Sequence, residues 1–188
     1  MSFFDSLGQA AARFCGVAGS YDPDAAGSKT VLDWMENSAV GICVAASPTG
    51  YYIALAFHAI GLSMLVGVSW VIALSLLGKI KNTSLTGLYR LSRLAWWGLA
   101  INAVSGVLLF FSEANKAYYS ISFRIKLSLV LLGCLILGWI SKTILRPATQ
   151  RHLDLLPASA RLQAWSTIVV WVFVIFVGRF MSYLTNIQ

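Results

Sequence analysis

The sequence has few charged residues. Only 11% of its 188 residues are Asp, Glu, Lys or Arg, whereas 58% are hydrophobic. A soluble domain usually carries about 25% charged residues, so this chain cannot cover itself with an ordinary polar surface. The composition predicts an integral membrane protein rather than a soluble one. The net charge of +7 is therefore not read as a nucleic-acid-binding surface, and no nucleic-acid partner is expected.

Cysteine and histidine are also scarce. The three cysteines, Cys15, Cys43 and Cys134, are widely spaced and form no CxxC pair, so the sequence predicts neither a disulfide framework nor a zinc site. The histidines are His58 and His152. Phosphate-binding loops, GxSxG and HExxH motifs and paired carboxylates are missing, and the sequence does not favour an enzyme.

Long apolar runs are the main feature that the sequence does have. Four of them reach the roughly 20 residues that a helix needs to cross a bilayer, and helices are the expected form because lipid cannot pair free backbone groups. We expect an all-α, integral membrane four-helix bundle over residues 51–188. The predicted spans are 51–78, 94–112, 123–143 and 163–184.

Basic residues are concentrated in the first and third connections between these spans. A single acid, Asp154, accompanies them. Loops rich in basic residues lie on the cytoplasmic side of the membrane. Because the chain crosses the membrane four times, both termini are then predicted on the outer, periplasmic side of a bacterial inner membrane. The basic residues are Lys79, Lys81, Arg90, Arg93, Lys142, Arg146, Arg151 and Arg161.

Residues 1–50 are predicted to form a periplasmic N-terminal segment. Within it, the stretch TVLDWMENSAVGICVAASP sets Trp34 and Met35 beside Asp33 and Glu36. The stretch is too short and too polar to cross a membrane. We expect one short helix that lies along the outer interface, and a buried re-entrant segment is the alternative.

Polar residues within the spans are the candidate functional residues, because ionisable groups at membrane depth are costly. His58 and Ser105 lie at about the same depth, roughly 10 Å below the outer ends of their spans. Lys126 and Arg179 lie within about 8 Å of the outer surface, and Glu113 closes the second span. All five lie in the outer part of the membrane, which argues against a transport path across it.

The role of His58 has three interpretations. The residue shares a helix face with Ala54 and Gly61, so we expect it to face the bundle interior. It is a structural histidine bonded to a neighbouring helix, a contact for a quinone or a b-type haem, or a copper ligand. Lys126 and Arg179 either extend to lipid headgroups or bind an acidic group of a ligand.

Two stretches resemble a family of small bacterial membrane proteins of unknown function. They are VLDWMENSAVGICVAASPTGYYIALAFHAIGLSMLVGVSWVIALSLLG and GVLLFFSEANKAYYSISFRIK. The resemblance runs from about Val31 to Trp139 and implies a four-helix inner-membrane protein, distantly similar to the copper-resistance D type of membrane domain. It implies that five residues occupy characteristic positions of the family, namely His58, Glu113, Tyr119, Arg124 and Lys126.

The sequence therefore favours a non-catalytic membrane subunit that anchors or completes a larger complex, plausibly a redox or respiratory one. Its expected partners are membrane lipids and other membrane or periplasmic subunits. The first alternative is an electron-transfer subunit that binds a quinone or haem b through His58 and the outer polar residues. The second is a copper or small-solute transporter. No set of metal ligands is predicted.

Overall fold

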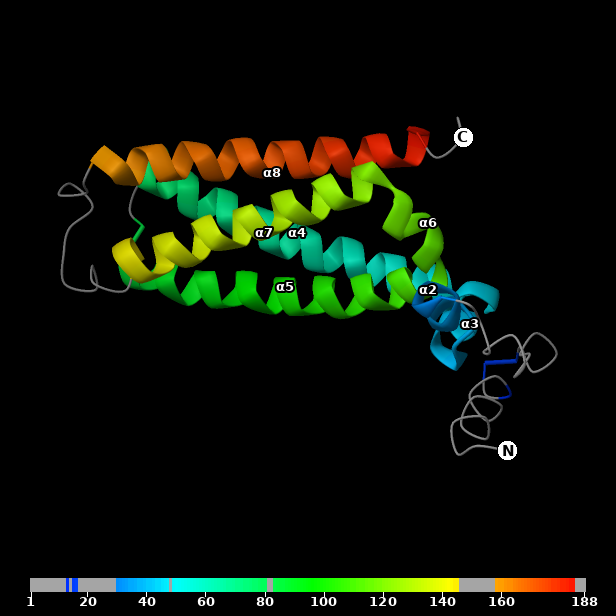
Figure 1. Cartoon of the computed structure of the whole chain (residues 1–188). Helices are drawn as coiled ribbons and strands as arrows, with labels where there is room; N and C mark the ends of the chain where they lie inside the picture. The colour runs from blue at the N-terminus through cyan, green and yellow to red at the C-terminus, as the bar shows by residue number, and fades with distance from the viewer. Residues whose placement is uncertain are drawn as a thin grey trace. The chain divides into compact units, whose positions relative to one another are not determined.

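The fold is all-α, as predicted. In the computed structural model every regular element among the described residues is a helix. Four helices are long and apolar enough to cross a membrane, as many as the sequence predicts, and they indicate a multi-pass membrane protein. They are α4 (Gly50–Leu76), α5 (Leu85–Ser112), α7 (Ile121–Ile140) with its π-helical extension η2 (Ser141–Leu145), and α8 (Ala158–Leu184) (Figure 1). The structure describes residues 13, 15–16, 30–47, 49–80, 83–145 and 158–184.

All four long helices begin before their predicted spans, and α5 and α8 begin earlier by at least five residues. Helix α5 begins at Leu85 rather than at Leu94, because the Ser84 hydroxyl accepts a hydrogen bond of 3.0 Å from the backbone N–H of Gly87. The helix therefore includes Arg90, which hydropathy assigns to a connection. Helix α8 also begins before its predicted span. Hydropathy detects only the apolar part of a helix, so it does not include the polar first turns of α5 and α8.

Three short helices accompany the long ones, and we call them the cap. They are α2 (Val31–Glu36), α3 (Ala39–Ala46) and α6 (Ala114–Tyr119). The single helix predicted over the N-terminal stretch is two helices, because Ser38 begins a new one. Its hydroxyl accepts a hydrogen bond of 3.2 Å from the backbone N–H of Gly41, which is the usual N-cap arrangement.

The chain divides into two compact units, and α4 and α5 contribute to both. The first unit holds residues 1–61 and 100–120, and the second holds residues 62–99 and 121–188. The first unit thus contains the cap with the start of α4 and the end of α5. The second contains the remainder of α4 and α5 together with α7 and α8.

The second unit has one apolar core to which all four long helices contribute. Its completely buried side chains include Leu65 of α4, Leu88 of α5, Leu137 of α7 and Trp171 of α8. Helix association in lipid depends on close van der Waals packing rather than on the removal of apolar surface from water. Four helices that share buried side chains in this way form a bundle within this unit.

The structure corrects the cysteine prediction, because Cys15 and Cys43 form a disulfide. Their Cα atoms lie 5.6 Å apart, and 28 positions separate them in the sequence. A single disulfide between cysteines so far apart in the sequence produces no repeated cysteine spacing, so the sequence pattern does not reveal it. The bridge ties residue 15 to helix α3, whereas Cys134 is free and buried.

Helices α7 and α8 approach closely at Gly133. A Cβ atom on this glycine would lie 2.9 Å from Cζ2 and 3.0 Å from Cε2 of Trp171, which is closer than ordinary van der Waals contact. Because Trp171 is completely buried, its ring has little room to move. Gly133 therefore sets the distance between the two helices at this level.

We predict that Gly133→Ala destabilises the protein by about 1–3 kcal/mol, the usual cost of overpacking. Thermal unfolding of the purified protein in mild detergent measures this effect. Gly67→Ala is the matched control, because nothing lies within 4 Å of its added methyl group and alanine is the better helix former. A control variant that loses as much stability as Gly133→Ala would contradict the packing argument.

Candidate functional site

His58 of α4 and Ser105 of α5 lie together in the first unit, at the common depth that the sequence predicts. His58 Nδ1 lies 3.1 Å from the backbone oxygen of Asn102 and 3.3 Å from the Ser105 hydroxyl. In return, the side-chain amide of Asn102 donates a hydrogen bond of 2.9 Å to the backbone oxygen of His58. Each residue of the His58–Asn102 pair thus bonds to the backbone of the other helix.

The hydrogen bonds indicate which nitrogen of His58 carries the proton. The backbone oxygen of Asn102 can only accept, so the short contact requires a proton on Nδ1. The Ser105 hydroxyl donates to the backbone oxygen of Ile101 at 2.7 Å. A neutral His58 therefore keeps its lone pair on Nε2, and Nδ1 is no base for Ser105. The pair does not form an activated serine nucleophile.

Gly106 gives the imidazole access to α5. In a regular helix the backbone oxygen of Asn102 faces residue 106, one turn later, and a side chain there would crowd it. A Cβ atom on Gly106 would lie 3.2 Å from His58 Cε1 and 3.4 Å from Nδ1. Sequence reasoning missed this residue, and the available signal was a glycine four positions after a polar residue of a span.

A second polar cluster joins α2 to α6 in the cap. The backbone N–H of Asn115 donates a hydrogen bond of 2.8 Å to Glu36 Oε1. Its side-chain amide donates to Asp33 Oδ1 at 2.9 Å and to Glu36 Oε2 at 3.0 Å. The sequence predicts Asp33 and Glu36 as the polar face of an interfacial helix. In the structure these carboxylates hold the first turn of α6.

Hydrogen bonds also keep the Asp33 carboxylate ionised. The hydroxyl of Thr30, and next the amide of Asn115, lower the pKa of Asp33 below its usual value of 3.8, because both groups donate to the ionised form. A carboxyl whose folded pKa is lowered stabilises the fold above its unfolded pKa. The Asp33 contribution is therefore complete at neutral pH and is lost as the pH falls through the lowered pKa.

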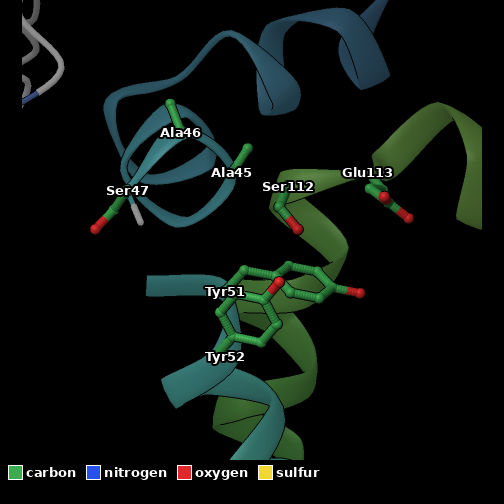
Figure 2. Close-up of a pocket in the computed structure, with 7 residues that line it drawn as sticks. All are labelled: Ala45, Ala46, Ser47, Tyr51, Tyr52, Ser112 and Glu113. Atoms are coloured by element: carbon green, nitrogen blue, oxygen red, sulfur yellow. The ribbon is translucent and has the colours of Figure 1, made fainter. Parts of the chain in front are cut away.

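A pocket of about 400 Å³ lies in the first unit, where α3 ends, α4 begins and α5 ends (Figure 2). Two tyrosines of the first turn of α4 line it, and their rings meet edge to face with centroids 6.1 Å apart. The end of α5 supplies a hydroxyl and a carboxylate. The lining residues are Ala45, Ala46, Ser47, Tyr51, Tyr52, Ser112 and Glu113.

The remaining candidates in the first unit are Glu113 and Tyr119. Glu113 belongs to the lining residues of the pocket, and its carboxylate lies 3.5 Å from the ammonium group of Lys116, with both side chains about half exposed. Tyr119 is exposed, and its ring contacts Tyr118 edge to face at 5.4 Å.

The other three candidates lie in the second unit. Arg124 and Arg179 are exposed, and Lys126 is half-buried. The Lys126 side chain passes along α8, with its Cε 3.6 Å and its Nζ 3.8 Å from the position of a Cβ on Gly178. The Lys126 side chain thus lies beside the backbone position that precedes Arg179. The interpretations of these cations as headgroup contacts or as ligand clamps both stay predictions.

Metal ligands are sparse in the described part of the chain. No group of three or more His, Cys, Asp or Glu side chains lies together among those residues. Cys43, a neighbour of His58 in sequence, is bonded to Cys15 and does not offer a thiolate. His152 lies outside the described residues.

We predict that His58→Leu costs on the order of 1 kcal/mol of stability, whereas His58→Gln is nearly neutral. A hydrogen bond between membrane helices contributes about 0.6 kcal/mol and at most about 2, and glutamine can still donate to the Asn102 carbonyl. Unfolding of both variants in mild detergent measures the difference. Equal losses for the two variants would show that the imidazole ring, and not its hydrogen bond, matters.

We also predict that acid loosens the cap before it unfolds the spans. Hydrogen exchange of the α2 and α6 amides should rise as the pH falls below about 3.8, the usual pKa of Asp33, once the known pH dependence of intrinsic exchange is corrected. Asn115→Ala should raise the same exchange at neutral pH. Lys116→Ala, an exposed change on the same helix, is the control. Unchanged protection in Asn115→Ala would contradict the proposed role of these bonds.

Comparison with known proteins supports one part of the resemblance. No curated protein and no solved structure matches the chain significantly, so nothing supports the expected likeness to the copper-resistance D type. The model of a family of unknown function, DUF6644, matches residues 31–184. That range contains all four long helices and all three helices of the cap. The chain therefore belongs to the family of unknown function DUF6644.

Proposed function

We propose that the protein is a non-catalytic, multi-pass membrane subunit that anchors or completes a larger complex and contacts its partners through the cap. One observation carries the proposal: the polar side chains of the first unit are used to join elements of the protein. His58 and Asn102 join α4 to α5, and Asn115 joins α6 to α2. Polar groups committed to assembly suit a structural subunit better than an enzyme.

The proposed membrane is the bacterial inner membrane, with the cap and both termini on the periplasmic side. The basic connections support this orientation by the positive-inside rule. The disulfide between Cys15 and Cys43 supports it independently, because disulfides persist in oxidising compartments such as the periplasm and are rare in the cytosol. Two unrelated properties of the chain thus favour the same orientation.

The cap presents apolar side chains that suit a contact with another subunit. Val31 and Trp34 of α2 and Tyr118 and Tyr119 of α6 are all exposed. Aromatic side chains are enriched both in the buried centres of protein interfaces and at the boundary between lipid and water. We assign the cap surface to a neighbouring membrane or periplasmic subunit, with lipid headgroups at its edge.

A second candidate function is that of an electron-transfer subunit that binds a quinone or haem b. One observation favours it. A histidine that binds a ligand through Nε2 usually donates its Nδ1 proton to a carbonyl or carboxylate, and His58 donates to the backbone oxygen of Asn102. The same bond therefore fits a histidine that fastens two helices and one that is oriented toward a ligand.

The orientation is tested by cysteine labelling in sealed cells, in a Cys134→Ala background that retains the disulfide. Cysteine introduced at the exposed position Lys116 of α6 should react with a membrane-impermeant maleimide. Cysteine at Lys79 or at Ser159 should react only after the membrane is opened, because these residues flank the basic connections. Labelling at Lys79 in sealed cells would overturn the orientation.

The proposed function is tested by native electrophoresis of membranes solubilised in mild detergent. We predict that the wild-type protein migrates in an assembly larger than its own dimer. Trp34→Ala combined with Tyr119→Ala should release it from that assembly, because aromatic side chains dominate the binding energy of interfaces. Leu135→Ala combined with Phe173→Ala, two exposed positions of the spans, is the control. A protein that migrates alone from native membranes would contradict the proposal.

A further inference from the structure

The pocket between the beginning of α4 and the end of α5 has a distinctive chemistry. Figure 2 shows two tyrosine rings on one side, with the end of α3 and the end of α5 facing each other beyond them. Glu113 is the one charged residue among the lining residues, although the chain as a whole has a net charge of +7. The volume of the pocket, about 400 Å³, is within the usual range for small-molecule sites.

Aromatic faces and a carboxylate both attract cations. The negative face of a tyrosine ring binds ammonium groups, and a carboxylate accepts charge-assisted hydrogen bonds from them. We propose that this pocket binds an ammonium group, presented either by a lipid headgroup or by a soluble amine. Tyr51 and Tyr52 supply the aromatic wall, and Glu113 supplies the negative charge. The proposal does not depend on the function proposed above.

The Ser112 hydroxyl of the pocket is arranged to accept a further hydrogen bond. The Ser112 hydroxyl donates its proton to the backbone oxygen of Leu109 at 2.8 Å, which leaves its oxygen as an acceptor toward the pocket. The Ser47 oxygen already accepts a bond of 3.3 Å from the backbone N–H of Gly50. An ammonium group needs acceptors rather than donors, and the acceptors proposed here are the Ser112 oxygen and the Glu113 carboxylate.

Lys116 shows that Glu113 can hold an ammonium group. The two charged groups lie 3.5 Å apart, with both side chains about half exposed, and exposed pairs of this kind are weak. Lys116 does not belong to the lining residues. A ligand whose ammonium group enters the pocket therefore competes with a weak internal partner, and removal of that partner should favour the ligand.

The position of the pocket suits both sources of an ammonium group. Its tyrosines belong to the first turn of one apolar helix, and Ser112 ends another. The ends of membrane-spanning helices lie at the level of the lipid headgroups. A headgroup amine and an amine dissolved in the adjacent water can both reach this level.

The experiment measures the melting temperature of the full-length protein in detergent against rising concentrations of choline and of ethanolamine. The uncharged carbon analogue of choline, 3,3-dimethylbutan-1-ol, has nearly the same shape and serves as the control for apolar binding. In a parallel arm, the melting temperature is compared between nanodiscs of phosphatidylethanolamine and nanodiscs of phosphatidylglycerol. A response to the soluble amines assigns a soluble ligand, and a response to phosphatidylethanolamine alone assigns a lipid headgroup.

Four variants assign any response to the pocket. Glu113→Gln should weaken the apparent affinity by about tenfold or more, because it removes the charge. This variant should fold, since the Glu113 side chain makes no cap hydrogen bond to α6. Lys116→Gln should bind as tightly as the wild type or more tightly. Tyr52→Leu should weaken binding, whereas Tyr52→Phe, which keeps the aromatic face, should not.

Three results would overturn the proposal. The first is that the uncharged analogue stabilises the protein as well as choline does. The second is that Glu113→Gln retains the wild-type affinity. The third is that neither soluble amine nor phosphatidylethanolamine raises the melting temperature of the wild-type protein. Any one of them means that the pocket does not recognise an ammonium charge.

Discussion

The reciprocal hydrogen bonds between His58 and Asn102 are the interaction on which the first unit depends. The hydrocarbon core of a bilayer holds no water to satisfy a polar side chain, so such a group must find a partner within the protein. Here each side chain uses a backbone oxygen of the opposite helix. The hydrogen bonds that His58 needs in lipid therefore also hold α4 against α5. Ser105 belongs to the same cluster of polar groups.

The cap is also held together by hydrogen bonds between elements. Asp33 and Glu36 of α2 accept hydrogen bonds from Asn115 of α6. The disulfide between Cys15 and Cys43 adds a covalent tie to α3. A cross-link of this length is expected to stabilise the folded cap by roughly 3–4 kcal/mol through the lost freedom of the unfolded chain. The cap is therefore a folded element rather than a loose extension of the spans.

Features that follow from composition and from helical rise could be predicted from the sequence. The four spans are apolar runs, and the shared level of His58 and Ser105 follows from 1.5 Å per residue. Features that depend on which atoms come into contact in the folded protein could not be predicted from the sequence. The roles of Gly106 and Gly133 are set by helix rotation and distance. The disulfide of Cys15 is set by the path of the chain, and no spacing rule contains that information.

The central claim is that His58 is a structural residue that fastens two helices and does not ligate a haem, and the optical spectrum of the protein tests it most directly. The measurement compares the air-oxidised and dithionite-reduced protein, purified in mild detergent from its native membrane. Our account predicts no Soret band, no reducible chromophore and an identical spectrum for the His58→Leu variant. A Soret band that is present in the wild type and lost in His58→Leu would contradict it and would identify His58 as a haem ligand.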